Sequence, residues 1–207
     1  HPLVLELINR GSIGATFHET LETYVEKEIF SKLSGGEKRL LGALAVFREP
    51  MPLEALTMQE LETDLLDDLV DKGLARQVDT ENYDVHDLVR EFLSRSHDDQ
   101  TRRDLHAAAV EWYRTRRREP SQKIEFLYHL RYTGDSEELG AEIATTGRQL
   151  VASGHMELLG ILDGIEKSDV EDSAWAVVLE LRGDILSIQG RWEEAGELHA
   201  EALEVLD

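Results

Sequence analysis

Residues 74–87, "LARQVDTENYDVHD", decide the fold of the N-terminal half of this chain. Two short segments that favour extended structure flank the turn-rich residues 79–82, and this pattern predicts a β-hairpin. Helical patterns precede the hairpin, and "LVREFLSRS" after it resumes a helical pattern. Three helices followed by a two-stranded wing, within about 65 residues, is the order of a winged helix-turn-helix.

The first of these helices is predicted to begin in residues 33–41, "LSGGEKRLL", a stretch that resembles the signature loop of ABC-type ATPases. Such an ATPase would also need a phosphate-binding G-x-x-x-x-G-K-[ST] upstream, and the sequence has none. Ser34 and Glu37 have the spacing of a capping box just before an apolar helical run. We therefore interpret the stretch as a helix start.

Two further helices are expected before the wing. Pro50 and Pro52 should end the first helix and open a short second one. The leucine spacing in residues 57–72 predicts a third helix, which Gly73 closes. Acidic residues dominate this third helix, so it should be repelled by DNA phosphates.

The composition describes a globular, acidic protein. The chain has 207 residues, 41% of them apolar, which is enough for one or two small domains. Because it has no cysteine and no apolar run of membrane-spanning length, we expect a cytoplasmic setting and no membrane partner. The formal net charge of −21 argues against nucleic acid as a partner and is similar to the surfaces of proteins from salt-loving organisms. The first residue is not methionine, which favours a piece of a longer protein.

From about residue 100 onward the sequence predicts helices only, arranged as a repeat. The segments "GDSEELG", "GHMELLG" and "GRWEEAG" begin at residues 134, 154 and 190 and share the pattern Gly-x-x-Glu-x-apolar-Gly. Each first glycine would allow the left-handed backbone that ends one helix before the next begins. Intervals of 20 and 36 residues are typical of stacked helical hairpins. Trp112, Tyr113, Trp175 and Trp192 lie at helical spacing and are predicted to form hairpin core.

The last 34 or so residues, "WAVVLELRGDILSIQGRWEEAGELHAEALEVLD", resemble a tetratricopeptide repeat. Gly183, Gly190, Ala195 and Ala202 match the small-residue positions of that family, and Trp192 matches an aromatic position. Leu179 and Arg182 depart from its preferred tryptophan and leucine. The resemblance implies α-α hairpins that bind a protein or peptide partner.

The N-terminal part resembles signal-transducing regulatory ATPases of the STAND class, which includes NB-ARC and apoptotic ATPases. "HPLVLELI" is similar to the Gly-x-Pro-Leu segment of their lid, and "YDVHDLVREFL" is similar to the end of their winged helix. The resemblance implies that Pro2, His86 and Asp87 contact ADP in a longer parent protein that binds ATP or ADP and could form oligomers. Alternatively, His86 only ends the wing and caps the next helix with Asp87. This piece lacks the ATPase core, so we expect no cofactor bound to it alone.

Other kinds of site have weaker support. The basic segment "WYRTRRREP" carries Arg114, Arg116, Arg117 and Arg118; it either ends a helix favourably or docks an acidic surface. The eight histidines show no metal-ligand spacing, and no serine has the setting of a nucleophile. We therefore predict no catalytic residue and no metal site.

The resulting interpretation is a mainly α chain, a winged helix followed by tetratricopeptide-like hairpins. The expected divisions are a lid tail at 1–32, a winged helix at 33–98, irregular hairpins at 99–172 and a tetratricopeptide repeat at 173–207. The expected function is a non-enzymatic regulatory region of a signal-transducing ATPase, in which the winged helix senses nucleotide and the repeats bind a protein. The alternative is a DNA-binding transcriptional regulator with a repeat sensor.

Overall fold

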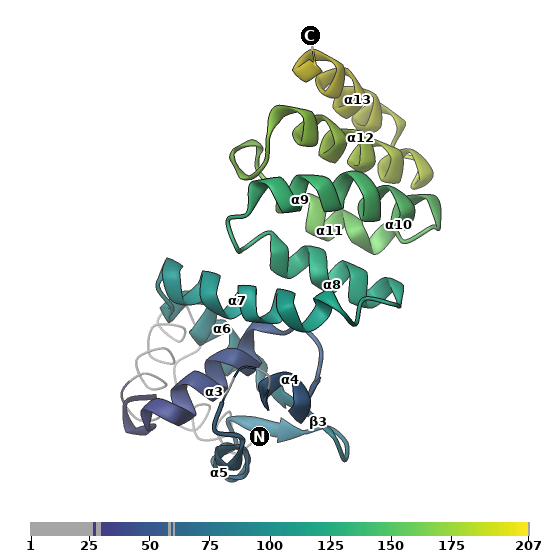
Figure 1. Ribbon diagram of the computed structural model, residues 1–207. Coiled ribbons are helices and arrows are strands. Elements are labelled where there is room, and N and C mark those ends of the chain that lie inside the picture. Colours follow the sequence, from purple (N-terminus) through teal and green to yellow (C-terminus); the bar gives the residue numbers. More distant parts are fainter. Residues whose placement is uncertain (1–26, 28–29, 58, 60, 207) are drawn as a thin grey trace, which may run out of the picture. The chain divides into compact units, whose positions relative to one another are not determined.

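The computed structural model describes residues 27, 30–57, 59 and 61–206, and the chain divides into two units between Asp98 and Asp99 (Figure 1). Of the predicted lid tail, the described part includes one turn of 3-10 helix, η2 (Phe30–Lys32), while Pro2 lies outside the described residues. No helix in the described part of the chain is both long and apolar enough to cross a membrane.

Unit 1 is built on helix α3 (Gly35–Val46), which begins at the predicted capping box. The Ser34 amide donates to Glu37 Oε2 at 2.8 Å, and the Glu37 amide donates to Ser34 Oγ at 3.2 Å. The Glu37 carboxylate is buried and also accepts from Lys72 Nζ. These contacts hold the pKa of Glu37 at about 2, the Lys72 hydrogen bond being the largest cause. The helix start expected from the sequence is confirmed.

The segment after α3 departs from the sequence prediction in two ways. An edge strand, β1 (Met51–Pro52), precedes the expected short helix α4 (Leu53–Thr57). The prediction of one long third helix over 57–72 is wrong. The chain forms a 3-10 turn, η3 (Thr63–Leu65), and a six-residue helix, α5 (Leu66–Asp71), instead. Of the leucines in residues 57–72, only Leu66 and Leu69 are buried, so only the C-terminal part of the expected helix packs into the core.

The wing is an antiparallel hairpin, as predicted. Strands β2 (Ala75–Gln77) and β3 (Asn82–Val85) pair with Ala75 opposite Val85, and β1 adds to the other side of β3 with Met51 opposite Tyr83. The sheet order is therefore β1-β3-β2. Gly73 ends α5 with φ 69°, a left-handed conformation that favours glycine. Helix α6 (Asp87–Ser96) follows β3 and completes a winged helix.

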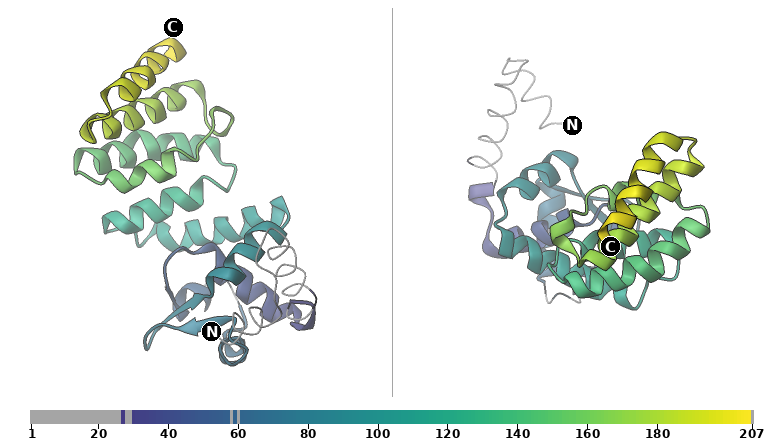
Figure 2. Two further views of the ribbon diagram at one scale, coloured as in Figure 1. Left: turned by 180° about the vertical axis from the view of Figure 1, so that it is seen from behind. Right: turned by 90° about the horizontal axis from the view of Figure 1, so that it is seen from above.

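Unit 2 consists, in its described residues, of helical segments arranged in successive layers (Figures 1 and 2). Helices α7 and α8 pack together, as do α12 and α13, and the α9 to α11 segments lie between these pairs. Segment η4 is a π-helical stretch that joins α9 to α10. The bounds are α7 (Asp99–Arg114), α8 (Pro120–Leu130), α9 (Ser136–Glu142), η4 (Ile143–Gly147), α10 (Arg148–Ala152), η5 (Met156–Leu158), α11 (Leu159–Leu162), η6 (Lys167–Asp169), α12 (Asp172–Ile188) and α13 (Trp192–Leu206).

The prediction that glycines in a left-handed conformation separate the helices of the hairpins is confirmed. Gly134, Gly154 and Gly190 have φ values of 81°, 88° and 80°, and each precedes the next helical segment. Gly183 is the point of close approach within the last hairpin, since a Cβ there would lie 2.7 Å from the His199 ring. The fold class is therefore a winged helix followed by tetratricopeptide-like helical hairpins.

Three of the four aromatic residues predicted as hairpin core are buried, namely Trp112, Tyr113 and Trp175. The prediction is wrong for Trp192, whose relative exposure is 70%. The buried side of α13 is marked by Ala195 and Ala202. By helical spacing Trp192 lies beside that face and not at its centre, so its ring is left at the surface.

Candidate functional site

The predicted nucleotide-facing triplet lies at the junction of β3 and α6. His86 is the N-cap of α6: its amide donates to the Leu74 carbonyl at 3.2 Å, and its carbonyl accepts from the amides of Val89 and Arg90 at 2.8 and 3.0 Å. Asp87, the first residue of the helix, is exposed. The backbone of His86 is thus fixed from both sides, by the end of the wing and by the helix.

Asp84, a buried residue that the sequence reading did not single out, organises this junction. Its Oδ1 accepts from Arg90 Nη2 at 2.5 Å and from the Val85 amide at 2.8 Å. Its Oδ2 accepts from Arg76 Nη2 at 2.6 Å, an ion pair that raises the pKa of Arg76. Arg90 also donates to the carbonyls of Ala45, at 3.0 Å, and Phe47. One carboxylate therefore joins both wing strands to α6, and Arg90 continues the connection to the end of α3.

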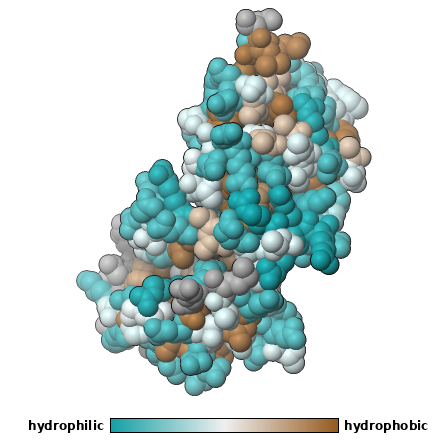
Figure 3. All heavy atoms as spheres, viewed as in Figure 1, coloured by the Kyte–Doolittle hydropathy of each residue, from teal (hydrophilic) through white to brown (hydrophobic). Residues whose placement is uncertain are grey.

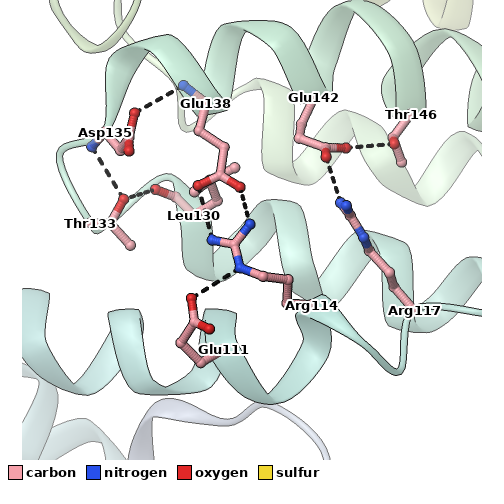
Figure 4. A network of polar contacts seen from close by, with 9 residues as sticks. All are labelled: Glu111, Arg114, Arg117, Leu130, Thr133, Asp135, Glu138, Glu142 and Thr146. Carbon is pink, nitrogen blue, oxygen red and sulfur yellow. Dashed lines mark hydrogen bonds and ion pairs between the residues drawn. The ribbon is translucent and has the colours of Figure 1, made fainter.

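The four arginines of the predicted cationic docking cluster have different surroundings: two form ion pairs with α9, and two lie on the connection between α7 and α8. Arg114 makes a two-bond ion pair with Glu138, at 2.5 and 3.1 Å, and donates to Glu111 at 3.0 Å (Figure 4). Arg117 donates to Glu142 at 2.6 Å and lies over the Phe126 ring. The hydrogen bonds raise the pKa of Arg114 further above its usual range, Glu138 being the main cause. These two arginines link the end of the α7 segment to α9.

Arg116 and Arg118 lie on the connection between α7 and α8. The Arg116 guanidinium stacks 3.8 Å from the centre of the Trp112 ring, and Arg118 is exposed. Both line a shallow depression with Thr115, Glu119 and Gln122. A docking role for this cluster stays a prediction; Arg114 and Arg118 are exposed, and Arg116 and Arg117 are partly buried.

Unit 2 contains a groove whose lining residues the sequence did not single out, although the resemblance to tetratricopeptide repeats implies a surface that binds a protein or peptide. It lies between α12 and α13 and reaches the start of α10, and we call it the α12–α13 groove. Its lining is largely apolar and includes one ion pair, between Arg148 and Glu180. The lining residues are Arg148, Ser173, Ala176, Val177, Glu180, His199, Ala202, Leu203 and Leu206.

The charged groups of the α12–α13 groove are paired across helices. Arg148 donates two hydrogen bonds to Glu180, at 2.9 and 2.5 Å. This pairing lowers the pKa of Glu180 and raises that of Arg148. His199 Nε2 lies 3.7 Å from Asp184 Oδ1, within range of an ion pair when the imidazole is protonated. The α12–α13 groove thus presents both apolar and charged side chains.

Other chemistry has little support in the described residues. No group of three or more histidine, aspartate or glutamate side chains there could hold a metal ion. Helix α5, which corresponds to the recognition helix of a winged helix, has six residues, and Asp67, Asp68 and Asp71 are among them. Its negative charge opposes approach to DNA phosphates.

Comparison with known proteins adds a likeness of fold. No protein-family model matches the chain, and no curated protein matches it. A solved structure that resembles it is the Signal Transduction ATPase with Numerous Domains (STAND) protein with a tetratricopeptide repeat sensor from Pyrococcus horikoshii. The TM-score is 0.63 at 24% sequence identity, and the match covers 98% of this chain. The chain spans 30% of the length of that protein.

Proposed function

We propose that this chain is a non-catalytic regulatory region of a STAND-type ATPase, in which unit 2 binds a protein partner and unit 1 responds to bound nucleotide. The observation that carries the proposal is the fold likeness over 98% of the chain to part of a STAND protein described as having a tetratricopeptide repeat sensor. The motifs at 85–87 and 174–207 support the same assignment from the sequence.

Partner binding by unit 2 is supported by the α12–α13 groove and by the architecture. A helical hairpin cannot bury both of its faces alone, and a stacked array leaves an extended surface suited to a protein. The test is capture of partners on the immobilised chain, followed by hydrogen exchange of the purified complex. We expect protection in residues 99–207, and protection confined to residues 1–98 would contradict the assignment.

The nucleotide role of unit 1 rests on His86. An imidazole that donates to a phosphate makes a charge-assisted hydrogen bond of about 1.5–3 kcal/mol, which corresponds to roughly 10- to 100-fold in affinity. In the longer ATPase, His86→Ala should therefore speed ADP release by about that factor. His155→Ala, a histidine of unit 2, is the control. ADP release from folded His86→Ala at the wild-type rate would leave His86 a structural N-cap residue only.

The chain by itself should not hydrolyse ATP. Its sequence has no phosphate-binding loop, and in the described residues no group of three or more histidine, aspartate or glutamate side chains could hold the magnesium ion that phosphoryl transfer uses. Phosphate release from the purified chain should equal that of a heat-inactivated sample. Release above that control, co-purifying with the chain, would refute the non-catalytic assignment.

A further inference from the structure

A cluster with an excess of positive charge lies beside His86 on an otherwise acidic protein. Hydrophilic side chains cover much of the face drawn in Figure 3, and the sequence has 43 acidic residues against 22 lysines and arginines. In this cluster Arg76 and Arg90 share the single carboxylate of Asp84. The three side chains therefore carry one more positive charge than negative, which attracts an anion.

Arg76 lies on the same face of the wing as His86. Arg76 is opposite Asp84 in the β2–β3 pair. His86 follows Asp84 by two residues, has an extended backbone and bonds through its amide to the Leu74 carbonyl, so it continues the pairing. Because side chains alternate between the two faces of a strand, Arg76 is a diagonal neighbour of His86 on one face. Diagonal neighbours are about 7–8 Å apart, a distance that a long side chain spans.

The Arg76 guanidinium is anchored and still accessible. Its Nε and Nη2 donate to Asp84 Oδ2 at 3.2 and 2.6 Å, whereas Nη1 makes no hydrogen bond with the described part of the chain. The Arg76 side chain is 59% exposed and that of Asp84 is 8% exposed, so a buried carboxylate holds an exposed cation. Asp84 raises the pKa of Arg76, and the charge of Asp87 adds to the rise, so the guanidinium lies near the first residue of α6.

The open edge of this guanidinium suits a phosphate group. Arginine presents a planar pair of N–H donors that matches two phosphate oxygens. A diphosphate has oxygens on two phosphorus atoms and can meet Arg76 and His86 at once. Arg90 is less available, since its side chain is 23% exposed and donates to the carbonyls of Ala45 and Phe47. The charge of Asp87 opposes an anion, but the free amides at the start of α6 offset it.

We propose that Arg76 is a second phosphate-binding residue beside His86, and that the two residues together bind the diphosphate of a nucleoside diphosphate. Asp84 is then a positioning residue that fixes the Arg76 guanidinium. This inference rests on the proposed nucleotide role of unit 1 and adds to it a residue that the sequence did not single out.

The test is a titration of the whole chain with inorganic pyrophosphate, ADP and adenosine, followed by NMR of the His86 imidazole and the Arg76 Nε–Hε group. The variants are Arg76→Gln and Arg76→Lys. The matched control is Arg95→Gln on α6, because the Arg95 side chain is 56% exposed and is also ion-paired. Amide spectra establish that each variant is folded before its affinity is compared.

We expect pyrophosphate and ADP to shift both resonances at concentrations on the order of 1 mM, and adenosine to shift neither. Arg76→Gln should weaken pyrophosphate binding about tenfold, the usual effect of losing one charge-assisted hydrogen bond. Arg76→Lys keeps the charge and should lose less, and Arg95→Gln should bind as the wild type does. A solely structural ion pair would leave the affinity of folded Arg76→Gln unchanged.

Unchanged affinity of folded Arg76→Gln would overturn the proposal, as would the absence of any shift at His86 in the wild type. Shifts spread over many surface cations without saturation would mean an adventitious ion only and would also overturn it. The release experiment with His86→Ala in the longer ATPase is independent of these results. Rapid ADP release there, with no effect of Arg76→Gln here, would reject Arg76 alone, whereas normal release would reject the nucleotide as the ligand.

Discussion

Asp84 is the residue at which both strands of the wing and helix α6 are joined. Its carboxylate is buried and accepts hydrogen bonds from Arg76 and Arg90, while Arg90 reaches two carbonyls at the end of α3. His86, two residues further on, takes its position from this arrangement. The sequence did not reveal the cluster, because a single aspartate in a wing gives no sign that it is buried or which arginines pair with it.

Asp84→Asn should destabilise unit 1. The change removes the negative charge that compensates the partly buried Arg90, and breaking a buried ion pair in this way costs about 3 kcal/mol. Hydrogen exchange of peptides covering β3 and α6 measures the loss. Asp67→Asn makes the same charge change on the exposed side of α5 and should cost less than about 0.5 kcal/mol. Equal exchange in the two variants would show that the Asp84 cluster is not needed for stability.

His106 and His129 form a second buried polar cluster, between α7 and α8. Their Nδ1 atoms lie 2.9 Å apart and both rings are buried, so one imidazole donates to the other, and the accepting ring must be neutral at this nitrogen. Tyr113 and Tyr132 stack on the pair. Burial, followed by the positive charges of Arg102 and Arg131, lowers the pKa of His106 to about 3.

At the scale of elements, the features that depend on residues close in sequence were predicted correctly, and several that depend on contacts with distant segments were not. The capping box of α3, the wing turn and the three hairpin glycines are set by residues close in sequence, and each was predicted. The length of α5 and the existence of β1 depend on contacts with distant segments: β1 is a two-residue strand only because β3 pairs with it. The residues that line the α12–α13 groove were not predicted for the same reason, since they come from three helices.

Gly183 tests the close approach of α12 and α13. A Cβ at Gly183 would lie 2.7 Å from the His199 ring, whereas a Cβ at Gly196, within α13, would meet no atom within 4 Å. Gly196→Ala should therefore stabilise the chain by about 1 kcal/mol, the usual gain of alanine over glycine in a helix. Gly183→Ala should be less stable than Gly196→Ala by about 1–3 kcal/mol, because the ring must move.

Thermal unfolding followed by tryptophan fluorescence compares these two variants, and adding His199→Ala to Gly183→Ala should restore the lost stability. If both glycine variants gain stability equally, the helices are not in close contact at Gly183.

At the scale of the whole molecule, the two units differ in the groups that respond to acid. Unit 1 contains the capping carboxylate of Glu37, whose pKa is about 2, and unit 2 contains the His106 and His129 pair. All three tryptophans, Trp112, Trp175 and Trp192, belong to unit 2, so tryptophan fluorescence follows that unit alone. The units can therefore be observed separately in the intact chain.

Acid should weaken unit 2 at a higher pH than unit 1. His106 has a pKa near 6.5 when unfolded and about 3 when folded, so between these values the unfolded state binds more protons. The stability of unit 2 should then fall as the pH falls below about 6.5, by up to about 1.4 kcal/mol per pH unit. For Glu37 the corresponding values are 4.5 and about 2, so its contribution to unit 1 is present above pH 4.5 and is lost as the pH falls from 4.5 to 2.

The two pH ranges can be measured on one sample, with urea unfolding at a series of pH values followed by tryptophan fluorescence for unit 2 and by NMR resonances of α3 for unit 1. Between pH 6.5 and 4.5 we expect the midpoint for unit 2 to fall while that for unit 1 changes less. His106→Gln with His129→Gln removes both imidazoles, so the slope for unit 2 in this range should flatten whatever the absolute stability of the variant. A slope in the variant equal to that of the wild type would mean that other groups cause the acid response, and the buried histidine pair would then have no part in it.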